Sequence, residues 1–150
     1  MLQQDKDYFM KKALEEARKA YDLGEIPVGA VCVYNKEIIA TGYNRVIMDN
    51  DPTAHAEIVA VREACKKNGN YRLKDVEIYV TVEPCPMCIS ALINARVSSL
   101  IFGAYSDKWG YMTRFSMDDS LWNHRVKVYG GMLSKDSEIL LKNFFKKKRY

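Results

Sequence analysis

Pro84-Cys85-Pro86-Met87-Cys88 joins a strand pattern to a helix pattern. The apolar residues before it, 76–82 (VEIYVTV), are typical of a buried β-strand. The residues after it, 89–95 (ISALINA), are typical of a short helix, and Pro86 suits a first helical turn, where no N–H partner is needed. The two cysteines therefore lie at a predicted helix N-terminus, whose unpaired N–H groups and partial positive charge favour thiolates.

A third metal ligand is available upstream of the cysteines. The chain has two histidines, and His55 begins the segment His55-Ala56-Glu57 at the predicted start of another helix. One histidine and two cysteines supply three ligands and leave the fourth position of a zinc ion open, as in catalytic zinc sites. Water bound there has its pKa lowered to about 7, and Glu57 would move its protons as base and acid.

The cysteine pair has other interpretations when it is taken alone. Cys-x-x-Cys also fits a redox pair or a structural zinc site. The joint pattern of His-x-Glu upstream and Pro-Cys-x-x-Cys downstream is the known signature of zinc-dependent nucleobase deaminases. We therefore expect a catalytic zinc site formed by His55, Cys85 and Cys88.

The composition predicts one domain that spans residues 1–150, because 150 residues with 48% apolar side chains suffice for a single core. No apolar run reaches the length of a membrane span, and the polar residues 1–7 lack the apolar core of a signal peptide. We therefore expect a cytoplasmic protein without a membrane partner. Four cysteines in such a chain do not predict a disulfide scaffold, and Cys32 and Cys65 suit buried positions. The net charge of +4 permits a polyanionic partner without requiring one.

The remaining periodicity predicts an α/β fold. A hairpin is followed by alternating helices and strands, an order that gives a mixed sheet of five strands with helices on both sides, in three α/β/α layers. Helices are predicted at residues 8–23, 54–67, 89–95 and 134–147, and strands at 27–34, 37–44, 76–82, 98–104 and 125–129.

Two further segments invite interpretation. Residues 105–123 show no clean period but are rich in aromatic side chains, so we expect a short helix there and a wall of the site. The end of the chain is basic, which fits either a solvated helix end or a surface that binds phosphates. Its cations are Lys142, Lys146, Lys147, Lys148 and Arg149.

The motifs resemble those of the cytidine deaminase superfamily, and within it the bacterial tRNA-specific adenosine deaminases of the TadA type. These enzymes convert adenosine to inosine at the wobble position, position 34, of a tRNA anticodon. The matching segments are residues 26–31 (IPVGAV), 51–58 (DPTAHAEI), 71–73 (YRL), 79–88 (YVTVEPCPMC), 102–104 (FGA), 123–126 (NHRV) and 144–145 (FF).

The resemblance implies a cytidine-deaminase-like fold, one zinc ion per subunit on His55, Cys85 and Cys88, and Glu57 as the proton shuttle. Water activated by zinc would attack C6 of the adenine, and ammonia would leave. The resemblance further implies a homodimer, a tRNA anticodon loop as partner, and backbone N–H groups of Ala56 and Cys85 near the reacting water. The residues that it assigns to substrate binding are Asn44, Ala56, Ala30, Pro84 and Ser106.

Some positions depart from the family pattern and support alternatives. Ser106 stands where an aspartate is expected, and Trp109 and Tyr111 are bulky for that loop. The terminal Tyr150 after a lysine-rich stretch resembles free-guanine deaminases of the superfamily, so a free-base or nucleoside deaminase acting on guanine or cytosine is the alternative. A non-catalytic RNA-binding subunit is disfavoured by Glu57, and we expect His124 to be a structural or loop-surface residue rather than a ligand.

Overall fold

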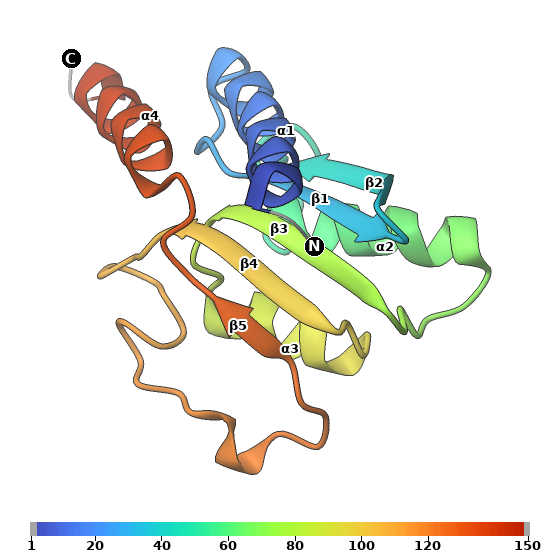
Figure 1. Ribbon diagram of the computed structural model, residues 1–150. Coiled ribbons are helices and arrows are strands. Elements are labelled where there is room, and N and C mark those ends of the chain that lie inside the picture. The colour runs from blue at the N-terminus through green and yellow to red at the C-terminus, as the bar shows by residue number, and fades with distance from the viewer. Residues whose placement is uncertain (1–2, 149–150) are drawn as a thin grey trace.

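The computed structural model describes residues 3–148, and its helices and strands follow the expected order (Figure 1). Tyr150 and Arg149 lie outside the described residues. The helices are α1 (Gln3–Asp22), α2 (Ala56–Asn68), α3 (Pro86–Asn94) and α4 (Ser134–Lys148), and the strands are β1 (Gly29–Tyr34), β2 (Glu37–Tyr43), β3 (Val76–Val82), β4 (Ser99–Ala104) and β5 (Lys127–Tyr129).

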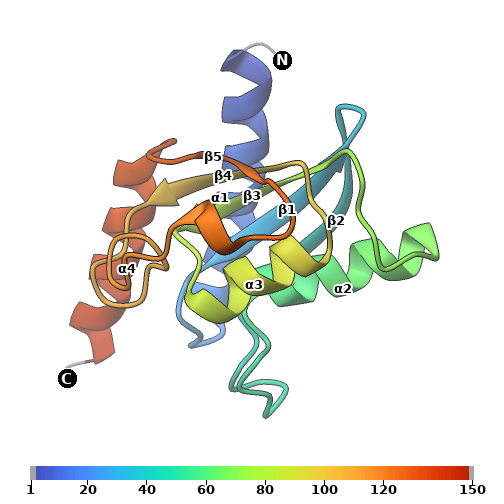
Figure 2. The same cartoon turned by 90° about the horizontal axis from the view of Figure 1, so that it is seen from below.

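The five strands form one mixed sheet in the order β2-β1-β3-β4-β5. β1 is antiparallel to both β2 and β3, whereas β3, β4 and β5 are parallel. Helices α2 and α3 pack on one face of the sheet and α1 packs on the other, where α4 also lies (Figure 2). The three-layer α/β/α architecture with a five-stranded mixed sheet is confirmed.

β3 is the central strand, and its burial explains its sequence. It hydrogen-bonds to β1 on one side and to β4 on the other, and every residue except Glu77 is buried. The apolar run of residues 76–82 is therefore the run of a strand covered on both faces. Because β3 and β4 are parallel, their carboxyl ends meet at one edge of the sheet, and the turn with Cys85 follows there.

Two boundaries differ from the expectation for a clear physical reason. α1 begins at Gln3 rather than at residue 8. Its first turn is polar and is held by a 3.1 Å hydrogen bond from Gln3 Nε2 to Asp7 Oδ1. Because this turn has no apolar residues at helical spacing, the sequence pattern did not predict it. β5 is shorter than predicted, since it pairs with β4 only from Lys127 onward. The irregular segment contains a 3-10 helix, η1 (Asp119–Leu121), as expected.

No helix within residues 3–148 is both long enough and apolar enough to cross a membrane.

α1 lies unusually close to the sheet at Gly29. A Cβ at this position would overlap the backbone of Ala13 and Ala17 in α1. The small residues Ala13 and Ala17 are themselves fully buried, so the helix has no side chain that could yield. This close approach fixes the start of β1, whose Gly29 N–H also donates to Thr81 Oγ1 at 3.2 Å in β3.

We expect Gly29→Ala to lower the free energy of unfolding by about 3 kcal/mol, because an overpacked backbone contact must open. Denaturant unfolding measures this difference. Gly24→Ala is the matched control: no atom lies within 4 Å of the added Cβ, and only its positive φ of 78° costs about 1 kcal/mol. Equal losses in the two variants would contradict the proposed close packing.

Candidate active site

Two helix N-termini meet at the carboxyl end of β3. His55 is the N-cap of α2 and Cys85 is the N-cap of α3, and both have extended backbone conformations. Neither N-cap side chain makes a capping hydrogen bond. The side chains are therefore available to a ligand, and the first N–H groups of both helices give the site a positive potential that favours thiolates and carboxylates.

The three predicted metal ligands come together. His55 Nδ1 lies 3.6 Å from Cys85 Sγ and 3.4 Å from Cys88 Sγ, and all three donor atoms lie within 4.8 Å of one another. A tetrahedral zinc ion with Zn–S of about 2.3 Å and Zn–N of about 2.0–2.1 Å separates sulfur and nitrogen donors by about 3.5 Å. The donor set and its spacing therefore fit zinc, and no fourth donor among the described residues joins the group.

Hydrogen bonding favours the thiolate form of Cys85. A hydrogen bond from Cys88 is the largest cause that lowers the pKa of Cys85 to about 4; burial opposes the shift and His55 adds to it. The same contact, together with burial, raises the pKa of Cys88. The hydrogen bond with Cys85 raises the pKa of His55. Because metal ligands bind in their deprotonated form, a divalent cation here would replace the protons that these side chains share.

Glu57 lies in the first turn of α2 beside the three donors and is only 4% exposed. Burial is the largest cause that raises the pKa of Glu57 to about 7. A backbone hydrogen bond, the nearby His55 and a hydrogen bond with Cys88 all act in the opposite direction, whereas Cys85 adds to the rise. A carboxyl group in this state can both accept and release a proton near neutral pH, as a general base and acid must.

A cavity of about 220 Å³ is lined by Glu57 and by two of the three donors, His55 and Cys85. The third donor, Cys88, is fully buried beside it. The cavity is smaller than the roughly 300–1,000 Å³ of pockets that enclose a drug-sized ligand, so it suits a single flat ring system. The residues that line it are Ile26, Val28, Asn44, His55, Ala56, Glu57, Val82, Glu83, Cys85 and Trp109.

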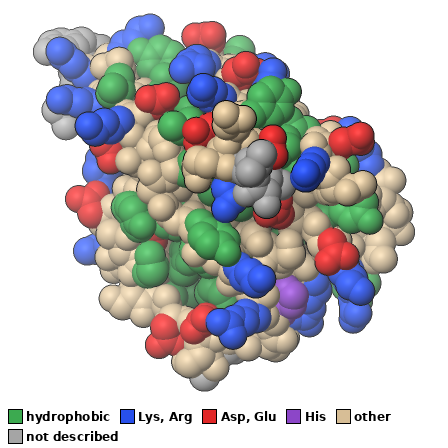
Figure 3. Space-filling model, viewed as in Figure 1, with side chains coloured by type: hydrophobic (Ala, Val, Ile, Leu, Met, Phe, Trp, Pro, Cys, Tyr) green, Lys and Arg blue, Asp and Glu red, His purple; other side chains and the backbone are tan. Residues whose placement is uncertain are grey.

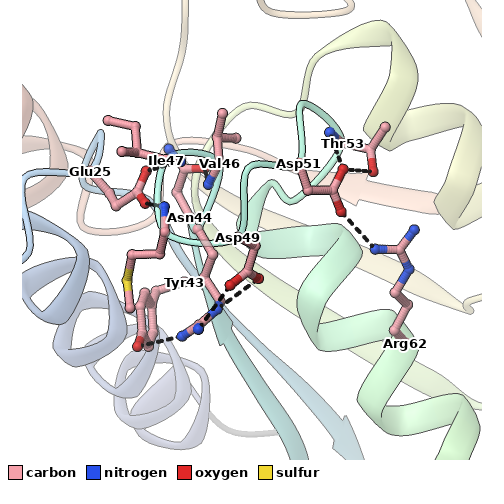
Figure 4. Close-up of polar contacts among 11 residues, drawn as sticks. Glu25, Tyr43, Asn44, Val46, Ile47, Asp49, Asp51, Thr53 and Arg62 are labelled. Atoms are coloured by element: carbon pink, nitrogen blue, oxygen red, sulfur yellow. Dashed lines mark hydrogen bonds and ion pairs between the residues drawn. The ribbon is translucent and has the colours of Figure 1, made fainter.

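The loop between Asn44 and His55 is held by polar contacts on both sides (Figure 4). The buried Glu25 carboxylate accepts the N–H groups of Ile47 at 3.1 Å and Met48 at 2.7 Å. Arg45 pairs with Asp49 at 3.0 Å. Further along the loop, Asp51 accepts the Thr53 hydroxyl at 2.7 Å and pairs with Arg62 of α2 at 3.5 Å. These contacts fix both ends of the loop, and Asn44 and His55 with them.

The residues predicted to bind substrate lie in different places. Asn44 and Ala56 line the cavity. Ala30 is fully buried in β1 within the core. Pro84 and Ser106 are buried and do not line the cavity, and Pro84 O accepts the Tyr111 N–H at 2.8 Å. Their roles in binding substrate stay predictions. The structural role expected for His124 is consistent with its Nε2, which lies 2.8 Å from Val97 O.

The sequence motifs did not identify Glu83 and Trp109 as residues of the cavity wall. Glu83 is buried with its carboxylate bonded to the backbone of the loop at residues 106–113, and its signal was its place directly before Pro84-Cys85. The aromatic segment at residues 105–123 was expected to form a wall of the site, and Trp109 agrees with this, but the sequence did not single out Trp109 among the aromatic residues of that segment. Its place on the cavity wall follows from the path of that loop, which no periodicity reveals.

Comparison with known proteins agrees with this geometry. The model of the MafB19-like deaminase family matches residues 4–149. A tRNA-specific adenosine deaminase of Aquifex aeolicus is 46% identical over 96% of this chain and 96% of its own length. A structure solved in studies of A-to-I editing by tRNA:A34 deaminases is 40% identical, with a TM-score of 0.83 over 89% of this chain and 99% of the other.

A likeness to purine-base deaminases also exists. A structure of the guanine deaminase from Nitrosomonas europaea is 26% identical, with a TM-score of 0.76 over 92% of this chain and 83% of the other. Its identity is well below that of the tRNA-specific relatives. The match along residues 4–149 and the curated relatives together show that this chain belongs to the MafB19-like deaminase family and, within it, to the tRNA-specific adenosine deaminases.

Proposed function

We propose that this chain is a zinc-dependent hydrolase that deaminates adenosine to inosine at the wobble position, position 34, of a tRNA anticodon. The observation that carries the proposal is the meeting of His55, Cys85 and Cys88 with the buried Glu57 beside a cavity sized for one base. The names of its relatives support the same substrate. A cytoplasmic location and a homodimer belong to the proposal.

Zinc is the metal that these donors favour, because two thiolates and one imidazole form a soft, tetrahedral ligand set. His55, Cys85 and Cys88 would hold it. When bound, zinc would activate a water molecule for attack on C6, the adenine carbon that carries the amino group.

Glu57 moves the protons in this proposal. Its carboxylate takes one proton from the attacking water, whose oxygen bonds to C6, and delivers that proton to the ring nitrogen next to C6. It then takes the second proton from the new C6 hydroxyl and delivers it to the amino group, so that the C6–N bond breaks, ammonia leaves and the C6 carbonyl forms. Asn44 orients the base: it is 7% exposed, and its amide is held by a 3.3 Å bond to Ile26 O and a 3.4 Å bond from the Val46 N–H.

The surface around α4 supports a polyanionic substrate. The last turn of α4 carries Lys146, Lys147 and Lys148, and Figure 3 shows basic side chains gathered toward this end of the molecule, at the upper left. Such a cluster favours phosphate contacts. The target base must be unstacked to enter a buried site, and the splayed bases of an anticodon loop lower that cost.

A guanine deaminase is the second candidate. The likeness to the Nitrosomonas europaea enzyme and the compact cavity favour it. A free base would fill such a cavity without further contacts, whereas the basic end of α4 would have no phosphates to bind.

The decisive experiment offers the protein an anticodon stem-loop with A34, the same stem-loop with C34, and free guanine. We expect inosine and one equivalent of ammonia from the A34 stem-loop, and neither from the C34 control. Ammonia from guanine, with no inosine in the RNA, would refute the tRNA assignment and establish the second candidate.

Cys85→Ala should reduce bound zinc from about one ion per chain to a small fraction of that, because two ligands cannot hold the ion. Metal analysis of the purified protein measures it. Cys65→Ala, which removes a half-buried cysteine of α2 outside the donor group, should keep its zinc. Full zinc content in Cys85→Ala would exclude the proposed ligand set.

Glu57→Ala should keep the zinc and the fold but lower turnover at least about 10²–10⁴-fold, the usual contribution of general acid–base catalysis. Single-turnover assays of inosine formation measure the loss. Glu63→Ala is the control on the same helix: Glu63 is exposed and pairs with Lys67 at 3.4 Å. The turnover of Glu63→Ala should match that of the parent. If Glu57→Ala also matched the parent, the proposed role of Glu57 would be wrong.

A further inference from the structure

Among the described residues that line the cavity, Trp109 is the one large aromatic side chain besides the metal ligand His55. We propose that Trp109 is a specificity-determining residue on whose indole face the target base stacks, and that Glu83 is the positioning residue that holds it there. The inference deepens the proposed function and rests on it, because it names how the same site grips a purine.

Glu83 ties the loop at residues 106–113 to the metal site. It is 1% exposed, and its carboxylate accepts three backbone N–H groups: Ser106 at 3.1 Å, and Met112 and Thr113 each at 2.9 Å. Hydrogen bonds to a charged acceptor are strong, and a buried carboxylate left without them would be costly. Because Glu83 directly precedes Pro84-Cys85, the loop takes its position from the turn that carries a metal ligand.

The backbone on both sides of Trp109 is also fixed. The Trp109 N–H donates to Ser106 Oγ at 3.1 Å. Lys108 Nζ lies 4.7 Å from the centre of the Phe145 ring, which joins the loop to α4. A Cβ on Gly110 would overlap the Glu83 carboxyl group, so the loop lies directly against this carboxylate. Trp109 is therefore a pre-arranged part of the wall.

The rest of the cavity has the chemistry of a slot for a flat ring. Ile26, Val28 and Val82 contribute aliphatic surface to the cavity. The polar side chains of Asn44 and Glu57 line the same cavity, together with His55 and Cys85. Stacking on an aromatic side chain holds a base by its π-face and leaves its edges to polar groups. The two fused rings of a purine cover more of an indole than a pyrimidine ring does, so Trp109 favours purines.

Fluorescence tests the contact directly, because the chain has only two tryptophans. In Glu57→Ala/Trp122→Phe, Trp109 is the sole tryptophan and turnover is blocked. Titration with the A34 stem-loop should quench its emission saturably, with the same affinity that a labelled stem-loop shows by anisotropy. Binding by anisotropy without any quench would overturn the proposal.

Kinetics test the consequence. Trp109→Ala should lower kcat/KM about ten- to a hundredfold, the usual loss when a stacking ring is removed, mainly through KM. Trp109→Phe should restore most of it. Phe115→Ala, which removes an aromatic ring of the same segment that is 52% exposed and outside the cavity, should leave both constants unchanged. A KM for Trp109→Ala within twofold of the parent would overturn the proposal.

Glu83→Gln tests the positioning role. Loss of one acceptor oxygen should loosen the loop, shift the Trp109 emission to the red in the Trp122→Phe background, and raise KM while zinc content stays at the parent level. An unchanged emission spectrum with an unchanged KM would refute the role of Glu83. If the parent deaminates guanine but not the A34 stem-loop, the tRNA assignment fails, and the same titrations with guanine decide on Trp109.

Discussion

The active site depends on the meeting of two helix N-termini at the carboxyl end of β3. His55 and Cys85 are both N-cap residues, and the side chain of neither makes a capping hydrogen bond to its own helix. Their side chains are therefore available as donors to a metal ion, while the helix termini supply a positive potential that favours thiolates and a carboxylate. The sheet makes the meeting possible, since β3 lies between an antiparallel and a parallel neighbour and is buried along its length.

Glu57 shows how opposing forces set a functional group. Burial alone would keep its carboxyl group protonated, whereas His55, its backbone hydrogen bond and Cys88 favour the ionised form. The balance leaves the pKa of Glu57 at about 7, where neither form dominates at neutral pH. The same burial that removes Glu57 from bulk water thus gives it the pKa that the proposed proton transfer needs.

The sequence allowed prediction of what depends on local pattern. The buried run at 76–82, the amphipathic helices and the His-x-Glu and Cys-x-x-Cys spacings identified the sheet, the order of elements and the donor group. The residues of the cavity wall were harder to predict from the sequence. Glu83 bonds to backbone groups more than 20 residues away, and Trp109 belongs to a segment without a regular hydrophobic period. The early start of α1 was not predicted because its first turn is polar on all sides and has no apolar residue that would indicate a helix.

Two buried carboxylates fasten the loops on either side of the cavity, Glu25 one and Glu83 the other, and both do so through main-chain N–H groups. Every amino acid but proline offers that donor, so this anchoring places little constraint on which side chains the loops display. Ile47, Met48, Met112 and Thr113 can be exchanged while the fastening persists. Such a scaffold can diverge toward new substrates by point mutation in these loops, while the donor group of His55, Cys85 and Cys88 stays unchanged.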